Sequence, residues 1–188
     1  HSRDKLQFTL SAFDRELLID PGVYSYAGQD VAKYMYTTPA HNTVTIDGYE
    51  QIRRSQDVSV KAPNFKFQTS DSLDYAEGFY DEKYDETKKI QATHKRKVAY
   101  IKSGYFLISD SLVSAGSHLA RQYWNFAPGK YTLNETTGIV NTNFDDGSNV
   151  MLIPVSYEGL EKNIGATAPY KGSSTAGANV AVPTLTLC

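Results

Sequence analysis

Apolar and polar residues alternate with a period of two through most of this chain, and this pattern constrains the fold more than any other feature. Successive side chains of a β-strand point to opposite faces of a sheet, so the alternation predicts strands with one buried face. Turn residues separate the runs, as in Pro21-Gly22 and Lys102-Ser103-Gly104. The predicted strands are residues 6–12, 16–20, 43–47, 58–61, 65–69, 73–80, 93–101, 105–112, 119–126, 138–143, 149–155 and 180–187. Many short strands joined by turns predict an all-β domain of stacked antiparallel sheets, a β-sandwich, with one helical turn near residues 29–36.

Chain length and charge narrow the possible partners. At 188 residues the chain can form one such domain, spanning residues 1–188, and is too short for two. The net charge of -2 provides no overall positive field, so we expect neither a nucleic acid nor a membrane as partner. An acidic partner would therefore have to be bound by local Lys and Arg side chains.

Three polar residues stand out because a sheet with a purely structural role does not require such residues at these positions. Asp20 ends an apolar strand just before Pro21-Gly22, His41 opens a later strand, and His1 precedes the first strand. A His-Asp-His set can bind Zn²⁺, which accepts nitrogen and oxygen ligands. Taken singly, each also has an ordinary explanation: Asp20 as a turn former and His41 as a surface hydrogen-bonding residue. Both interpretations remain open at the level of sequence.

Candidate substrate-binding residues lie in two loops. Residues 24–36 form a long polar connection with four tyrosines, among them Tyr26 and Tyr36, whose rings can stack on sugars. Arg53 is a candidate for binding a carboxylate or sulfate, because a guanidinium contacts both in a bidentate way. The basic run from His94 to Lys97 lies within a predicted strand, and we interpret it as a solvated sheet edge.

Two dense motifs resemble the C-terminal part of heparinase II/III-like polysaccharide lyases. Residues 4–26 read DKLQFTLSAFDRELLIDPGVYSY, similar to that family's aspartate, alternating strand and Leu-Leu-Val-Asp-Pro-Gly-x-Tyr element. Residues 40–51 read AHNTVTIDGYEQ, similar to its Ala-His-Asn-Thr-Val-x-Val-Asp-Gly element. Downstream segments resemble the family's hairpin and its aromatic-Phe-Ala-Pro-Gly turn, so the likeness runs from residue 4 to about residue 129.

The resemblance implies a two-domain enzyme of which this chain is the β-sheet part. Family members pair an N-terminal α/α toroid with the sheet domain and cleave acidic, uronic-acid-containing polysaccharides by β-elimination. It implies a zinc held by Asp20, His41 and a histidine before the first strand, where the family often reads His-x-His-x-Asp with the outer histidine catalytic. Here Ser2 stands at the place of the inner histidine, and His1 falls between the two places. His1 is therefore a shifted catalytic residue, a shifted ligand or not a native residue, and we take the first as our prediction.

Two other classes of protein compete with a lyase domain that is inactive by itself. One is a non-catalytic β-sandwich that binds carbohydrate or supports another domain. The other is a metal-dependent double-stranded β-helix enzyme, which normally places two His and a Glu close together on a strand, a pattern absent from this sequence. The resemblance favours a periplasmic or secreted protein, and the sequence leaves the identity of the uronan open.

Overall fold

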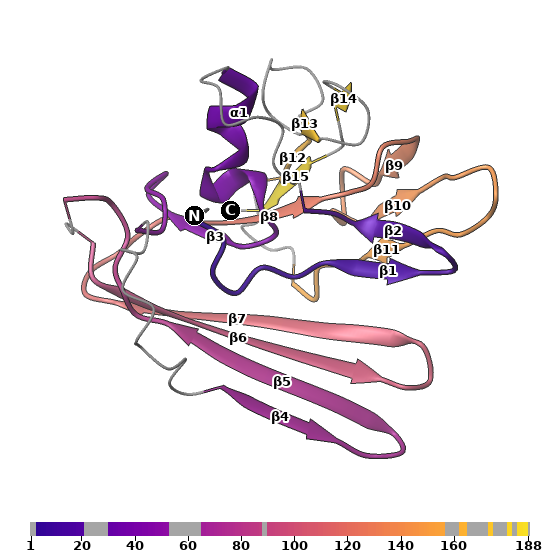
Figure 1. Ribbon diagram of the computed structural model, residues 1–188, viewed down its shortest axis with the longest axis horizontal. Helices are drawn as coiled ribbons and strands as arrows, with labels where there is room; N and C mark the ends of the chain where they lie inside the picture. Colours follow the sequence, from indigo (N-terminus) through magenta and orange to yellow (C-terminus); the bar gives the residue numbers. More distant parts are fainter. Residues whose placement is uncertain are drawn as a thin grey trace.

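Nearly all the secondary-structure elements of the described residues are strands in antiparallel sheets, which confirms the predicted fold class (Figure 1). The structure is a computed structural model that describes residues 3–20, 30–52, 65–87 and 90–156, and the backbone alone of residues 30–32 and of four short strands between residues 162 and 187. The helical segments are α1 (Asp30–Met35), where a helical turn was predicted, and the 3₁₀ turn η1 (Thr38–Ala40). Among the described residues, no helix is long and apolar enough to cross a membrane.

A long four-stranded sheet forms one layer of the molecule. Its strand order is β4-β5-β6-β7, and β6 and β7 pair over ten positions. A tight turn joins these two strands, with Gly104 at φ +123° and its N–H donating to the carbonyl of Ile101 at 2.9 Å. The strands are β4 (Lys66–Thr69), β5 (Leu73–Tyr80), β6 (Ala92–Ile101) and β7 (Tyr105–Ser114).

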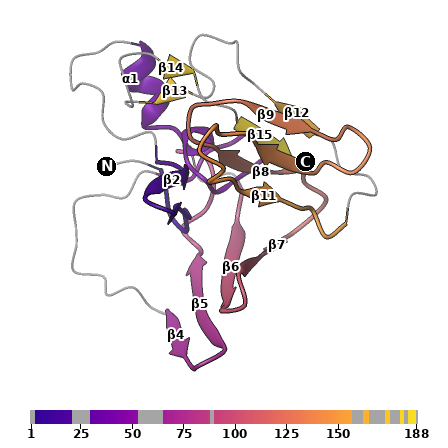
Figure 2. The ribbon, with the colours of Figure 1, turned by 90° about the vertical axis from the view of Figure 1, so that its right-hand side faces the viewer.

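The remaining sheets stack over this long sheet. In both views it lies below the other strands, with α1 at the opposite end of the molecule (Figures 1 and 2). A second four-stranded sheet has the order β12-β15-β8-β3, a three-stranded sheet the order β11-β10-β9, and β1-β2 and β13-β14 are hairpins. These strands are β1 (Leu10–Ala12), β2 (Arg15–Leu18), β3 (Val44–Ile46), β8 (Ala120–Asn125), β9 (Tyr131–Leu133), β10 (Val140–Thr142), β11 (Met151–Leu152), β12 (Lys162–Ile164), β13 (Ser173–Ser174), β14 (Val180–Ala181) and β15 (Thr184–Leu187).

A hydrophobic cluster joins the layers. Leu18, Trp124, Phe126 and Val140 are almost completely buried, and Ile108 of β7 packs against them from the long sheet. Burial of each such side chain contributes about 1.5–3 kcal/mol relative to exposure. The packing therefore fixes the positions of β2 and β8 over β7. It also fixes the start of the segment that follows β2 and, through the pairing of β3 with β8, the end of the segment that precedes β3.

The predicted strand over residues 6–12 is shorter in the structure. Only Leu10–Ala12 is a strand, and Leu6 has a positive φ of 61°. Side chains from other parts of the molecule, rather than a neighbouring strand, bind the backbone of this stretch, as described below. The predicted strand at residues 58–61 lies outside the described residues, and strand β9 was not predicted from the sequence.

Candidate functional site

Asp20 and His41 come together although 21 positions separate them. Asp20 follows β2, whose extension is fixed by the N–H of Ile19 donating to the carbonyl of Asn125 at 2.9 Å. His41 ends the turn η1, where its extended backbone (φ −115°, ψ 157°) leads into β3. The Nδ1 atom of His41 lies 3.2 Å from Oδ2 of Asp20. This proximity was predicted from the fold and the motif order.

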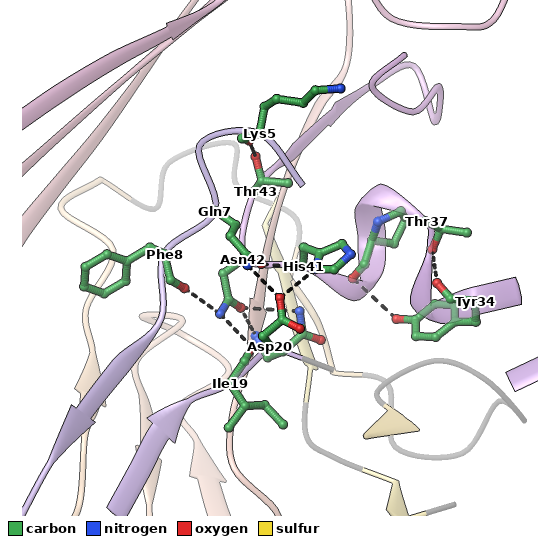
Figure 3. Close-up of polar contacts among 12 residues, drawn as sticks. Lys5, Gln7, Phe8, Ile19, Asp20, Tyr34, Thr37, His41, Asn42 and Thr43 are labelled. Atoms are coloured by element: carbon green, nitrogen blue, oxygen red, sulfur yellow. Dashed lines mark hydrogen bonds and ion pairs between the residues drawn. The ribbon is translucent and has the colours of Figure 1, made fainter. Parts of the chain in front are cut away.

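Gln7 completes the group and was not predicted. Its Nε2 donates to Oδ2 of Asp20 at 2.6 Å, and its Oε1 lies 3.1 Å from Nδ1 of His41 (Figure 3). A proton on Nδ1 therefore allows the imidazole to donate to both oxygens. We call these three side chains the Gln7–Asp20–His41 cluster. The only sequence signal for Gln7 is its position between two apolar residues in the first motif.

The cluster lies at the boundary between the interior and the solvent. His41 is 2% exposed, whereas the Asp20 side chain is 35% exposed. The Nε2 atom of His41 is buried and has no hydrogen-bond partner. A buried polar atom without a partner is costly, and three further atoms of the described residues share this state: Nε of Arg3, the hydroxyl of Tyr84 and Nδ1 of His94. The arrangement provides one carboxylate, one imidazole and one amide that converge from three segments of the chain.

The spacing of the donor atoms suits a zinc ion. Ligand atoms about 2.0–2.2 Å from a tetrahedral zinc lie roughly 3.3 Å from each other. The 3.2 Å between Nδ1 of His41 and Oδ2 of Asp20 is close to that value. Among the described residues, however, no three His, Cys, Asp or Glu side chains form a group that could hold a metal. The pair thus offers two ligands, and the third predicted position, His1, lies outside the described residues.

A buried glutamine fixes the segment that carries Gln7. Gln51 accepts from the N–H of Lys5 at 2.8 Å and donates to the carbonyl of Lys5 at 3.0 Å, as a neighbouring strand would. The hydroxyl of Thr43 donates to the same carbonyl at 2.9 Å. These contacts attach the N-terminal segment to the residues around β3 and bring Gln7 beside His41.

The remaining predicted site residues are only partly covered by the structure. Tyr36 is half-buried, and its carbonyl accepts a hydrogen bond of 3.4 Å from the N–H of Arg3, which places it beside the N-terminal segment. Tyr26 and Arg53 lie outside the described residues, so they stay predictions.

A hollow of about 210 Å³ opens near Arg3. Arg3 bridges Glu50, at 3.0 Å, and Glu86. Arg3, Gly48, Tyr49, Glu50, Gln51, Asp85 and Glu86 line the hollow. Its three carboxylates outnumber the single guanidinium, so the hollow favours hydroxyl or amino groups over sulfate.

The interpretation of the run from His94 to Lys97 as a solvated edge was wrong. Strand β6 lies between β5 and β7, and His94 and Arg96 are 0% and 3% exposed. Both side chains bind Asp110 on β7: Nε2 of His94 lies 2.8 Å from Oδ1, and Arg96 donates through Nε at 2.7 Å and Nη2 at 2.6 Å. The alternation was correct, but the apparent surplus of positive charge is balanced by this carboxylate.

This buried charge network extends from the long sheet to the sheet that contains β8. Gln122 of β8 donates to Oδ2 of Asp110 at 2.6 Å. Burial alone raises the pKa of Asp110, but the bonds from Arg96 and His94 outweigh it and hold that pKa well below its ordinary value. Asp110 is therefore ionised at neutral pH and balances the charge of the buried guanidinium.

The fold and the cluster define a class of protein: an all-β domain of stacked sheets with a His-carboxylate site at the edge of its interior. The chain belongs to the family described as Heparinase II/III-like, C-terminal, whose model matches residues 1–175. No curated protein sequence matches the chain.

Several solved structures share the fold over 99% of the chain. A heparan sulfate lyase HepC mutant from Pedobacter heparinus superposes with a TM-score of 0.77 at 21% identity. A heparinase III gene product gives 0.76 at 20% identity, and a heparinase III crystal structure gives 0.68 at 18%. The chain spans only 27–28% of the length of these proteins.

Proposed function

We propose that this protein is the sheet domain of a polysaccharide lyase that cleaves uronic-acid-containing polysaccharides by β-elimination. The observation that carries the proposal is the convergence of Asp20 and His41 in a domain whose family model covers residues 1–175. Similar structures include a heparan sulfate lyase, and the chain covers 28% of that protein. We therefore propose that the parent protein also contains an N-terminal toroid domain that forms the other wall of the substrate cleft.

The proposed reaction requires three groups around one sugar ring. A base removes the C5 proton, an acid protonates the leaving O4, and a positive or hydrogen-bonding group stabilises the charge that grows on the C5 carboxylate. We assign the acid-base role on this chain to His1, with Tyr26, Tyr36 and Arg53 as substrate contacts. His1 stands two positions before Arg3, which is bonded to Tyr36 and to the acidic residues of the hollow.

We further propose that Asp20 and His41 hold Zn²⁺, with His1 or water completing the shell. The 3.2 Å between Nδ1 of His41 and Oδ2 of Asp20, close to the separation of two ligands on one ion, supports a shared metal position, at which a deprotonated Nδ1 would be the ligand atom. A bound zinc supplies positive charge that fixes the two segments carrying its ligands. Because only two protein ligands are within the described cluster, affinity should be modest.

Metal analysis after equilibrium dialysis against excess zinc tests this part of the proposal. We expect about one equivalent of zinc per chain, lost in His41→Ala and retained in His118→Ala, which removes an exposed histidine in another loop. Absence of zinc from the wild-type chain, or equal loss in both variants, would contradict the assignment.

The 188-residue chain by itself should not cleave polysaccharide at a useful rate. Loss of one acid-base group typically costs about 10²–10⁴ in rate, and loss of a whole wall of the cleft also removes binding. The assay measures the ultraviolet absorbance of unsaturated uronate with heparan sulfate, alginate and other uronans. Robust turnover by this chain alone, abolished by His1→Ala and unaffected by His118→Ala, would show that the active site is complete within it.

The outer face of the long sheet favours a second function, non-catalytic carbohydrate binding. Lys66 and Lys95 both contact Glu77, at 3.4 and 3.0 Å, and Lys95 lies 4.7 Å from the centre of the Phe79 ring. Lysines beside an exposed aromatic ring can bind an acidic sugar by charge and stacking. Affinity electrophoresis in heparan sulfate distinguishes the two functions. Under this alternative the isolated chain is retarded, and Lys66→Ala and Phe79→Ala reduce the retardation.

A further inference from the structure

Asn42, the residue after His41, contacts residues adjacent in the chain to the other two cluster members, Gln7 and Asp20. Asn42 follows His41, and its Nδ2 donates to the carbonyl of Phe8 at 2.7 Å and to that of Ile19 at 3.0 Å (Figure 3). Phe8 is the residue after Gln7, and Ile19 is the residue before Asp20. The three segments that carry the cluster are therefore joined at a single amide group.

The acceptor side of the same amide is fixed as well. Oδ1 of Asn42 accepts from the N–H of Asn125 at 2.5 Å and from its Nδ2 at 3.3 Å. Asn42 is 0% exposed, so each of these bonds is shielded from water. An asparagine offers two donors and an acceptor in one plane, which a serine or an aspartate at this position does not provide.

A side chain of the long sheet, Arg96 of β6, holds the backbone of Asn42 in place. Nη1 of Arg96 donates to the carbonyl of Asn42 at 2.5 Å and to that of Leu6 at 2.8 Å. Leu6 precedes Gln7, so the guanidinium binds the neighbours of two cluster members. Because Arg96 is itself fixed by Asp110, the position of Asn42 is set by the rigid pairing of β6 with β7.

We propose that Asn42 is the positioning residue of the Gln7–Asp20–His41 cluster: its amide sets the distances among the three side chains without touching them. A site of this kind needs its groups within about 0.5 Å of the working geometry, and hydrogen bonds behind the contacting groups provide that precision. The functional value of the positioning rests on the function proposed above. The placement itself can be measured in the protein without metal or substrate.

The test compares Asn42→Ala with Asn149→Ala. Asn149 lies before β11 in the three-stranded sheet, and its amide oxygen accepts from the hydroxyl of Thr142 and the N–H of Phe144. Both variants lose an asparagine that joins chain segments, but only the first adjoins the cluster. Two readouts are made on the full chain: zinc affinity by titration calorimetry, and the ¹⁵N and ¹H signals of the His41 ring.

We expect Asn42→Ala to weaken zinc binding by about 10- to 100-fold and to shift the His41 ring signals. Asn149→Ala should change neither, when the two variants are compared at temperatures equally far below their melting points. Equal responses of the two variants, or wild-type behaviour of Asn42→Ala, would overturn the proposal. If Asn42→Ala does not fold, Asn42→Ser retains one donor and should give an intermediate loss, and a wild-type response of this variant also overturns the proposal.

The ring signals separate this inference from the proposed function. If the wild-type chain binds no zinc, the metal assignment fails, and the signals of His41 in the metal-free protein decide the role of Asn42. A change in the His41 ring signals that occurs only in the Asn42 variants supports the proposal that Asn42 positions the cluster. Unchanged signals overturn it.

Discussion

Replacing Asp110 by asparagine should destabilise the protein far more than the same replacement at the surface. Asp110 and Arg96 have side chains that are 8% and 3% exposed, and they are joined by two hydrogen bonds. Removing one partner of a buried ion pair leaves the other charge unpaired in the interior, which lowers the free energy of unfolding by about 3–5 kcal/mol. The asparagine amide would also present its own N–H groups to donors of Arg96 or Gln122. We expect a loss within that range out of a total of about 5–15 kcal/mol for a domain.

Asp146→Asn provides a control with nearly the same geometry. Nη1 of Arg15 contacts both carboxylate oxygens of Asp146 at 2.9 Å, but the two side chains are 30% and 55% exposed. Exposed ion pairs contribute about 0–1 kcal/mol, so this variant should lose less than about 1 kcal/mol.

Urea unfolding followed by the fluorescence of Trp124, the single tryptophan of the chain, measures both losses. The pKa of Asp110 is lowered in the folded state, so its contribution is present above the unfolded value near 4 and is lost as the pH falls below it. The gap between wild type and Asp110→Asn should therefore narrow in acid. A difference of less than about 1 kcal/mol between the two variants at pH 7 would refute the claim that Asp110 is needed to balance the buried charge of Arg96.

Three further outcomes are expected. The hydrogen bond with Asp47 raises the pKa of His118, and the same bond lowers the pKa of Asp47. The melting temperature of His118→Gln should therefore fall furthest below wild type between about pH 4 and 6.5, with the gap closing as the pH rises; a gap that widens in alkali would contradict this sign. Gly129→Ala places a Cβ against the ring of Phe144 and should cost about 1–3 kcal/mol in urea unfolding, whereas an unchanged midpoint would show that the ring moves freely. Gln7→His adds an imidazole to the cluster and should tighten zinc binding at least about tenfold by calorimetry, and unchanged affinity would argue against a shared metal position.

Sequence pattern was sufficient for the fold class and for most of the strands, whereas the pairing of Asp20 with His41 also needed the family resemblance. The alternation predicted both ends of β5 and the start of β7 without error. The proximity of Asp20 and His41 was predicted from the strand pattern together with the family resemblance, and in the structure the segments that carry them both adjoin β8.

The rest of the site depends on contacts that no local pattern contains. The stretch around Gln7 alternates like a strand, yet its backbone groups bind Gln51, Asn42 and Arg96, which lie 34–90 positions away in the chain. A side chain bonded to a distant carbonyl leaves no periodic signal. For the same reason Arg96 resembled a surface cation: its countercharge, Asp110, comes from the next strand of the sheet.

The span of these contacts along the chain has a consequence for how the protein folds. Strands β5, β6 and β7 follow one another in the chain, connected by residues 81–91 and 102–104, and can pair early. Arg96, in contrast, meets Leu6 across 90 positions and Asn42 meets Asn125 across 83. We therefore expect the N-terminal segment to dock late, after the long sheet has formed. A chain in which residues 3–20 have come away keeps that sheet but lacks two of the three cluster residues. The site would therefore form only in the completely folded protein. Protease cleavage near the N-terminus would abolish its function while most of the molecule stays folded.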